Sequence, residues 1–371
     1  MILTTILIFI IILGILVFVH ELGHFVMAKR SGMKVEEFGF GFPPRIFGIK
    51  KGETIYSINW IPVGGFVKIM GEDGNDTVNP QSFASKGFWP RFATLIAGVT
   101  MNVIFAWVIL SIAMGIGLPT VITESEHIPD SAKINNPSIV FSGVKKDSPA
   151  DVAGLKVGDK ILAVNGEQVD SIEEMQTLTK NRGGQETNFT VSRGNESIDK
   201  TLTPRQSPPE GEGPLGVSLD VVAQVAYPWY EVPFRGAVAT WNLLFGTISA
   251  FVTVIDQWLS GNSVGDQLSG PVGIAVLTRD VAQLGFIYLL QFTALLSINL
   301  AVVNAVPFPA LDGGRILFLV IEKIRGKKLP ETAEGVANTI GFALLILLMV
   351  FVTVRDFGRF DVIDKLRNLI T

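Results

Sequence analysis

The sequence predicts an α-helical membrane protein with about four transmembrane helices, a membrane-associated cytoplasmic β-hairpin region and an extracytoplasmic α+β domain. Of the 371 residues, 48% are hydrophobic and only 17% are charged, and the mean hydropathy is +0.43. This composition is too apolar for an ordinary soluble domain and too polar for a helix bundle that is buried along its whole length. Several apolar runs also reach the length of about 20 residues that spans a bilayer.

Four apolar segments are long enough to form transmembrane helices, which we place at residues 1–28, 92–118, 286–321 and 336–354. The first segment is expected to be retained rather than cleaved as a signal peptide, because no Lys or Arg precedes Lys29. A further segment, residues 234–259, alternates apolar and polar positions with helical spacing. This pattern favours an amphipathic helix on the membrane surface over a fifth span.

The distribution of Lys and Arg predicts the orientation of these helices. Cytoplasmic loops carry an excess of basic residues, and both residues 29–91 and residues 322–335 are rich in them. Residues 119–285 carry fewer basic residues for their length and are expected to face outward. The basic tail, residues 355–371, argues mildly against this orientation. Membrane lipid is an expected partner, whereas the net charge of −4 suggests no nucleic-acid partner.

The cytoplasmic segment 29–91 is predicted to contain β structure. Its stretches VEEFGFGFPPRIF and TIYSINWIPVGGFVKIM are rich in β-branched and aromatic residues and are punctuated by Gly and Pro. This pattern is typical of short strands joined in a hairpin. Because so many aromatic side chains lie between two expected spans, we expect the strands to dip into the membrane interface.

The outward segment 119–206 contains the run SPADVAGLKVGDKILAVNG. A short helix, a Gly-Asp turn, a strand and an Asn-Gly turn in this order resemble a PDZ domain, which we place at about residues 138–204. PDZ domains bind extended peptide by adding a strand to a sheet edge. The alternative is a small β-rich domain that binds nothing. Residues 207–285 are predicted to hold a Pro/Gly-rich linker, the amphipathic helix and a loop at 268–274.

Ionisable side chains in the first span indicate a metal centre. His20 and His24 lie four residues apart, so both imidazoles project from one face of a helix. This spacing lets two ring nitrogens bind one zinc ion, with Glu21 beside them as a general base. The alternative is a pair of helix-interior histidines that hydrogen-bond to neighbours. That interpretation gives no reason to place Glu21 in the membrane as well, where a charge is expensive.

A catalytic zinc usually has three protein ligands and one open position. The remaining histidine, His127, lies in the polar outward segment, so a carboxylate is expected to complete the site. Asp312 is the only carboxylate in the span 286–321, and helix-breaking residues surround it: Pro307, Pro309, Gly313 and Gly314. Non-helical backbone at membrane depth is tolerated only where protein or water surrounds it. The sequence therefore predicts Asp312 as a third ligand, with a helix cap at the membrane surface as the alternative.

These motifs carry a resemblance to a known family. HELGH at residues 20–24, NAVPFPALDG at residues 304–313 and a PDZ domain between them resemble the bacterial site-two protease family, of the regulator of sigma-E protease type but with a single PDZ domain. The resemblance covers nearly the whole chain. It implies zinc-dependent intramembrane proteolysis of single-span membrane proteins, such as anti-sigma factors or signal-peptide remnants, in the bacterial cytoplasmic membrane.

The resemblance also implies roles for further residues. Asn304 matches a family residue that holds the substrate backbone, and residues 268–274 resemble a loop near the active-site entrance. The family has a membrane-dipping hairpin that pairs with substrate strand to strand, and the matching residues are Gly64, Gly65, Phe66 and Val67. One departure is Val99, which stands where family members often have proline. This departure concerns local helix geometry rather than the chemistry.

Two other kinds of protein fit the sequence less well. A non-catalytic membrane scaffold with a PDZ domain would not need Glu21. A zinc or proton transporter would favour ionisable residues in several spans, and residues 92–118 and 336–354 have almost none.

The PDZ domain would either exclude substrates with bulky outer portions or receive a peptide. We favour exclusion, because GVKKDSPADVAGL shows the PDZ frame without chemistry specific enough to name a ligand.

Overall fold

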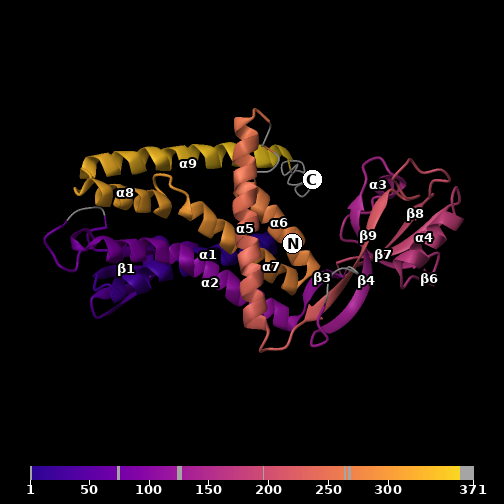
Figure 1. Cartoon of the computed structure of the whole chain (residues 1–371), viewed down its shortest axis with the longest axis horizontal. Coiled ribbons are helices and arrows are strands. Elements are labelled where there is room, and N and C mark those ends of the chain that lie inside the picture. Colours follow the sequence, from indigo (N-terminus) through magenta and orange to yellow (C-terminus); the bar gives the residue numbers. More distant parts are fainter. Residues whose placement is uncertain are drawn as a thin grey trace. The chain divides into compact units, whose positions relative to one another are not determined.

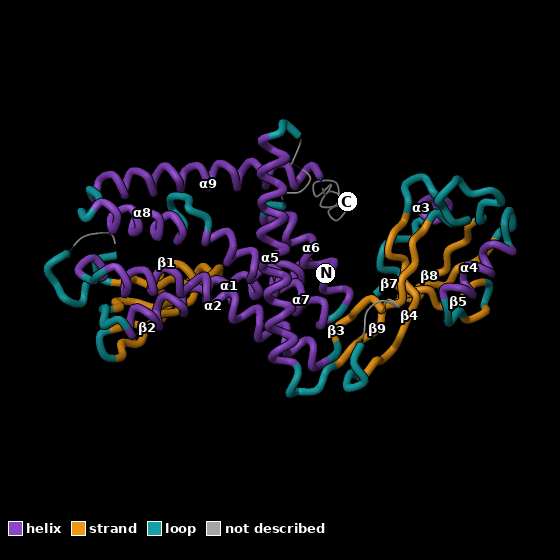
Figure 2. Tube along the Cα trace, viewed as in Figure 1, coloured by secondary structure: helices purple, strands orange, loops and turns teal. Residues whose placement is uncertain are grey.

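The computed structural model describes residues 2–72, 76–122, 128–194, 196–262, 265 and 269–359. The chain folds into two compact units. The first comprises Met1–Leu110, Gly236–Asp280 and Gln291–Thr371, and the second comprises Ser111–Arg235 and Val281–Leu290. Figure 2 shows that helices dominate the first unit and strands dominate the second.

Long apolar helices account for most of the first unit. Among the described residues, five helices are long and apolar enough to cross a membrane (Figure 1): α1 (Ile2–Arg30), α2 (Phe88–Ile116), α5 (Val232–Leu259), α7 (Phe286–Ala305) and α9 (Glu331–Arg359). The sequence predicted four spans and a surface helix at 234–259. α5 covers that segment as one continuous helix, and its place on or across the bilayer stays a prediction.

The predicted third span is two helices rather than one. α7 ends at Ala305, and α8 (Asp312–Arg325) begins after the non-helical residues 306–311. We expected Gly313 and Gly314 to help break the helix, but both lie in the first turn of α8. A Cβ atom on Gly313 would lie 2.3 Å from the carbonyl oxygen of Val306, and one on Gly314 would lie 2.2 Å from that of Phe308. These glycines therefore let the broken segment fold back tightly against the start of α8.

A helix replaces the loop that we expected at residues 268–274. Residues 269–270 lead into α6 (Pro271–Leu284), while Leu268 lies outside the described residues. Proline suits the first turn of a helix because its missing N–H has no partner there. The buried carboxylate of Asp356 accepts hydrogen bonds from the N–H groups of Gly270 and Gly273, at 2.9 and 2.7 Å. The sequence pattern did not reveal this cap because Asp356 is more than 80 residues away.

The β region that the sequence predicted between the first two spans is a hairpin of β1 (Val35–Lys51) and β2 (Thr54–Ile69) that folds back on itself. Residues 37–40 pair with residues 65–68 on one side and with residues 55–58 on the other. Within the described part of the chain, residues 65–69 are therefore paired along one edge only. The base of the hairpin packs into a buried cluster around Val35, Ile69 and Phe83.

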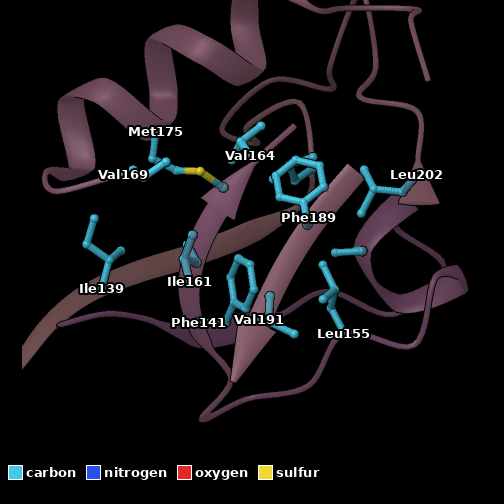
Figure 3. Close-up of a cluster of buried hydrophobic side chains, with 12 residues drawn as sticks. Ile139, Phe141, Leu155, Ile161, Val164, Val169, Met175, Phe189, Val191 and Leu202 are labelled. Carbon is cyan, nitrogen blue, oxygen red and sulfur yellow. The ribbon is translucent and has the colours of Figure 1, made fainter. Parts of the chain in front are cut away.

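The second unit is a β-rich domain. Its sheet has the strand order β3-β9-β4-β5-β7-β8, and β6 pairs with β5. The strands are β3 (Leu118–Ile122), β4 (Lys133–Val144), β5 (Lys160–Val164), β6 (Glu167–Gln168), β7 (Thr187–Arg193), β8 (Glu196–Leu202) and β9 (Val217–Ala226). Two helices, α3 (Pro149–Val152) and α4 (Ile172–Asn181), complete the domain. Figure 3 shows its core, in which Phe141 and Phe189 are fully buried.

This domain extends beyond the predicted residues 138–204. β9 pairs with β4 from Lys133↔Ala226 to Val144↔Val217, and Leu215 belongs to the buried core. The Pro/Gly-rich stretch before β9 suggested a linker, although a strand follows it directly. A cavity of about 510 Å³ lies beside α4 and the first residues of β9. The peptide-binding role that a PDZ domain would have there stays a prediction.

Candidate metal centre

The helix α1 brings two imidazoles together. His20 and His24 are only 6% and 7% exposed, and their Nε2 atoms lie 3.2 Å apart. Because the helix is continuous through this stretch, the four-residue spacing places both rings on one face. Two ring nitrogens therefore point to the same place.

Asp312 joins these two histidines from the far end of the sequence. Its Oδ2 atom lies 2.9 Å from His20 Nε2 and 3.3 Å from His24 Nε2. The three ligand atoms lie within 4.8 Å of one another, and no other such group of three is found among the described residues. Asp312 is the first residue of α8, so the break at residues 306–311 determines where its carboxylate points.

The surroundings of the two imidazoles fit a metal site. His24 Nδ1 lies 2.8 Å from the backbone oxygen of Thr94, and His20 Nδ1 lies 3.3 Å from the side-chain amide of Asn102. The Nδ1 atoms are therefore engaged by α2, which leaves both Nε2 atoms directed at Asp312. Two imidazole nitrogens and a carboxylate oxygen are a donor set that zinc takes in catalytic sites.

Glycines allow α2 to approach the histidines. A Cβ atom on Gly98 would lie 2.4 Å from His24 Nε2 and 2.7 Å from His20 Nε2. A Cβ atom on Gly23 would lie 2.3 Å from the backbone oxygen of Ala97. Any larger residue at either position would push the two helices apart, so close helix packing is a condition of the arrangement.

Glu21 lies beside the cluster and contacts the hairpin. Its Oε2 atom accepts a hydrogen bond from the backbone N–H of Val67, with an N···O distance of 3.1 Å. Gly64 and Gly65 also lie against α1, where Cβ atoms would come within 2.9 Å of Val17 Cγ1 and 3.4 Å of Phe18 Cα, respectively. Phe66 is in the same run and pairs with Gly39. The structure thus brings the predicted hairpin residues next to the predicted base.

One other sequence-predicted position, Asn304, is not brought into the cluster by any contact among the described residues. Asn304 is half-buried near the end of α7, and its amide makes no hydrogen bond with the described residues. The remaining histidine, His127, lies outside the described residues. The role of Asn304 stays a prediction.

Sequence reasoning missed the residues that support Asp312. Ala310 has a positive φ of 75°, and its N–H donates to Oδ1 of Asn338 in α9 at 3.0 Å. Three residues after Asp312, Arg315 forms an ion pair with Glu72 and donates to its backbone oxygen at 3.0 Å. A lone asparagine or arginine in an apolar helix indicates that a polar partner is needed. The partner lies far away in the sequence, so the sequence pattern does not identify it.

Two histidines on an apolar helix and a carboxylate from α8, with a glutamate next to them, define a metallopeptidase-like centre in a multi-pass membrane protein. Residues 8–348 match the model of peptidase family M50, and the chain belongs to that family. It is therefore a metalloendopeptidase with Zn²⁺ as its cofactor.

Named relatives agree with this assignment over almost their whole length. The zinc metalloprotease RasP of Geobacillus kaustophilus is 32% identical, with 95% of this chain and 97% of the relative covered. The regulator of sigma-W protease RasP of Bacillus subtilis is also 32% identical, with 96% and 99% covered. The zinc metalloprotease RasP of Oceanobacillus iheyensis is 30% identical, with 96% and 99% covered.

Proposed function

We propose that this protein hydrolyses peptide bonds in the membrane segments of single-span membrane proteins, with zinc held by His20, His24 and Asp312. The observation that carries the proposal is the meeting of these three side chains next to Glu21, with both histidines on a helix of transmembrane length and Asp312 at the start of the short helix α8. The name of the Bacillus subtilis relative, a regulator of sigma-W protease, supports substrates that control transcription, such as anti-sigma factors.

The chemistry follows from the residues at the cluster. Zinc, when bound, supplies a Lewis acid that polarises the scissile carbonyl and lowers the pKa of a water molecule to about 7. Glu21 accepts the proton of the attacking water and passes it to the leaving amine. Its closeness to His20 and His24 in α1 puts the carboxylate within reach of both proton transfers. A scaffold that only binds partners would need neither this base nor a metal centre.

One edge of β2 at residues 65–69 pairs with no other strand among the described residues, and it supports a binding mode for the substrate. A transmembrane helix satisfies its own amides, so it must unwind before a peptide bond can be cleaved. Pairing with residues 65–69 would satisfy the freed backbone groups by strand addition. The Val67 N–H already points to Glu21. A substrate carbonyl that took over this N–H would bring its peptide bond beside the base and release the carboxylate of Glu21 for catalysis.

The basic residues support an orientation in the bacterial cytoplasmic membrane. The loop between α1 and α2 would face the cytoplasm and the β-rich domain would face outward, because cytoplasmic loops are enriched in Lys and Arg. The proposed ligands are followed by Lys29 in α1 and by Arg315 in α8, which supports a position of the metal centre toward the cytoplasmic side. The outward domain would then control substrate access rather than supply catalytic groups.

Replacing Glu21 with Gln should abolish proteolysis and leave zinc binding intact, because it removes the base and keeps all three ligands. We expect fragments of a tagged single-span substrate to fall by about 10²- to 10⁴-fold. Immunoblots after co-expression with a panel of such substrates measure this, and metal analysis of the purified variant checks the zinc. Glu53→Gln, at a partly exposed position in the hairpin, is the control. Wild-type fragment levels in Glu21→Gln would remove Glu21 from the mechanism.

Replacing Val67 with Pro should stop cleavage while zinc remains bound. Proline removes the N–H that faces Glu21 and disrupts strand pairing, and no metal ligand changes. Val67→Ala is the matched control, because it shortens the side chain and keeps the N–H. Cleavage by Val67→Pro at the rate of Val67→Ala would show that substrate does not pair with this edge.

Thiol labelling should place the two loops on opposite sides of the membrane. The chain has no cysteine, so single cysteines can be introduced without background. Lys156→Cys, in an exposed turn of the β-rich domain, should react with a membrane-impermeant reagent in intact cells. Val78→Cys, at a position 88% exposed between the hairpin and α2, should react only after permeabilisation. The reverse pattern would invert the orientation.

A further inference from the structure

One face of α2 engages both histidines of the metal centre. Thr94, Gly98 and Asn102 are spaced four residues apart, so they line one side of the helix. Thr94 accepts through its backbone oxygen from His24 Nδ1, and Gly98 leaves room for the two rings. Asn102 is the third member of this row, and its side chain meets His20.

The position of Asn102 is unusual for a polar side chain. The residue is fully buried, and it is the only carboxamide in α2. Burying an amide is unfavourable unless its polar atoms are hydrogen-bonded. Its backbone oxygen accepts a hydrogen bond from Ser297 Oγ at 2.8 Å, which ties this turn of α2 to α7. Its Oδ1 atom is buried and has no hydrogen-bond partner among the described residues.

The tautomer that His20 needs as a metal ligand indicates a hydrogen-bond partner for the Asn102 Oδ1 atom. A neutral imidazole that binds a metal through Nε2 carries its proton on Nδ1, which must then donate. For His24 the acceptor is the Thr94 carbonyl. For His20 the neighbour is the Asn102 amide, whose Nδ2 atom lies 3.3 Å away. A half-turn of the amide exchanges its nitrogen and oxygen, so that the unpartnered Oδ1 accepts from His20.

We propose that Asn102 is a positioning residue for the metal centre, whose amide oxygen accepts the Nδ1–H of His20 and thereby holds Nε2 toward zinc. This inference rests on the proposed function, since it takes His20 as a ligand. Partners of this kind fix the tautomer and the direction of a ligating imidazole. α2 supplies both partners, so it acts as a template for the two rings without contributing a ligand.

The test compares zinc affinity among purified full-length variants by competition with a chelator. Asn102→Leu keeps the volume of the side chain and removes the acceptor, so zinc affinity should fall by about 10- to 100-fold. Asn102→Asp keeps an acceptor and should bind within a few-fold of wild type. Thr100→Val, at an exposed position of α2 whose hydroxyl donates to the Ile96 carbonyl, is the control, and its zinc affinity should not change. His20→Ala is the reference for a lost ligand.

Thermal unfolding of the metal-free proteins separates positioning from folding. Without metal, we expect Asn102→Leu and Asn102→Asp to unfold at temperatures near that of wild type. Once zinc is added, the unfolding temperatures of the two variants should differ. If Asn102→Leu binds zinc as tightly as wild type while His20→Ala does not, the positioning role is wrong and the metal site stands. If both Asn102 variants lose zinc and also melt early without metal, Asn102 is structural and the proposal is overturned. Full zinc binding by His20→Ala would instead overturn the proposed ligand set.

Discussion

Three side chains have to place their donor atoms within 4.8 Å of one another. His20 and His24 lie in a helix long and apolar enough for a bilayer, and Asp312 begins the short helix α8. Charged groups at that depth are unfavourable unless they are paired or bind a metal. The approach of His20, His24 and Asp312 therefore governs how closely the helices pack. Glycines make that packing possible at two places, through Gly98 beside the imidazoles and Gly313 beside the broken segment.

The irregular backbone before Asp312 is held from several directions. Asn338 of α9 binds the N–H of Ala310, and a Cβ atom on Gly341 would lie 2.5 Å from the oxygen of Pro309. Arg315 ties the first turn of α8 to Glu72, which lies shortly after the end of β2 at Ile69. The segment after the hairpin and the first turn of α8, which begins with Asp312, are thus connected through one ion pair. This arrangement explains how a non-helical segment can hold a carboxylate in a defined place.

Local patterns in the sequence were enough to predict much of the candidate metal centre. The four-residue spacing of His20 and His24 operates within one helix, so periodicity is enough to predict that the rings meet. Asp312 could be predicted because it is the only carboxylate in its span and stands among prolines and glycines. The supporting partners could not be predicted in this way. Asn102, Asn338 and Arg315 act through residues 28 or more positions away, and no local rule pairs them.

The same limit explains the errors in the fold. Helix α6 was not predicted because its N-terminal cap, Asp356, lies much later in the sequence. Strand β9 was not predicted because it follows a Pro/Gly-rich stretch and pairs with β4, which lies much earlier in the sequence. In both cases a long-range hydrogen-bond partner decides the local structure. Secondary-structure signals alone were sufficient for the long helices, where about 20 consecutive apolar residues leave few alternatives.

Zinc K-edge X-ray absorption on the purified protein tests the central claim most directly, because it reports the ligands without relying on activity. The account predicts a shell of nitrogen and oxygen donors at about 2.0 Å, with the outer-shell scattering of two imidazoles. His24→Ala should reduce that scattering to one ring. A wild-type spectrum with three imidazoles would bring His127 into the site in place of Asp312 and would contradict the ligand set derived from α1 and α8.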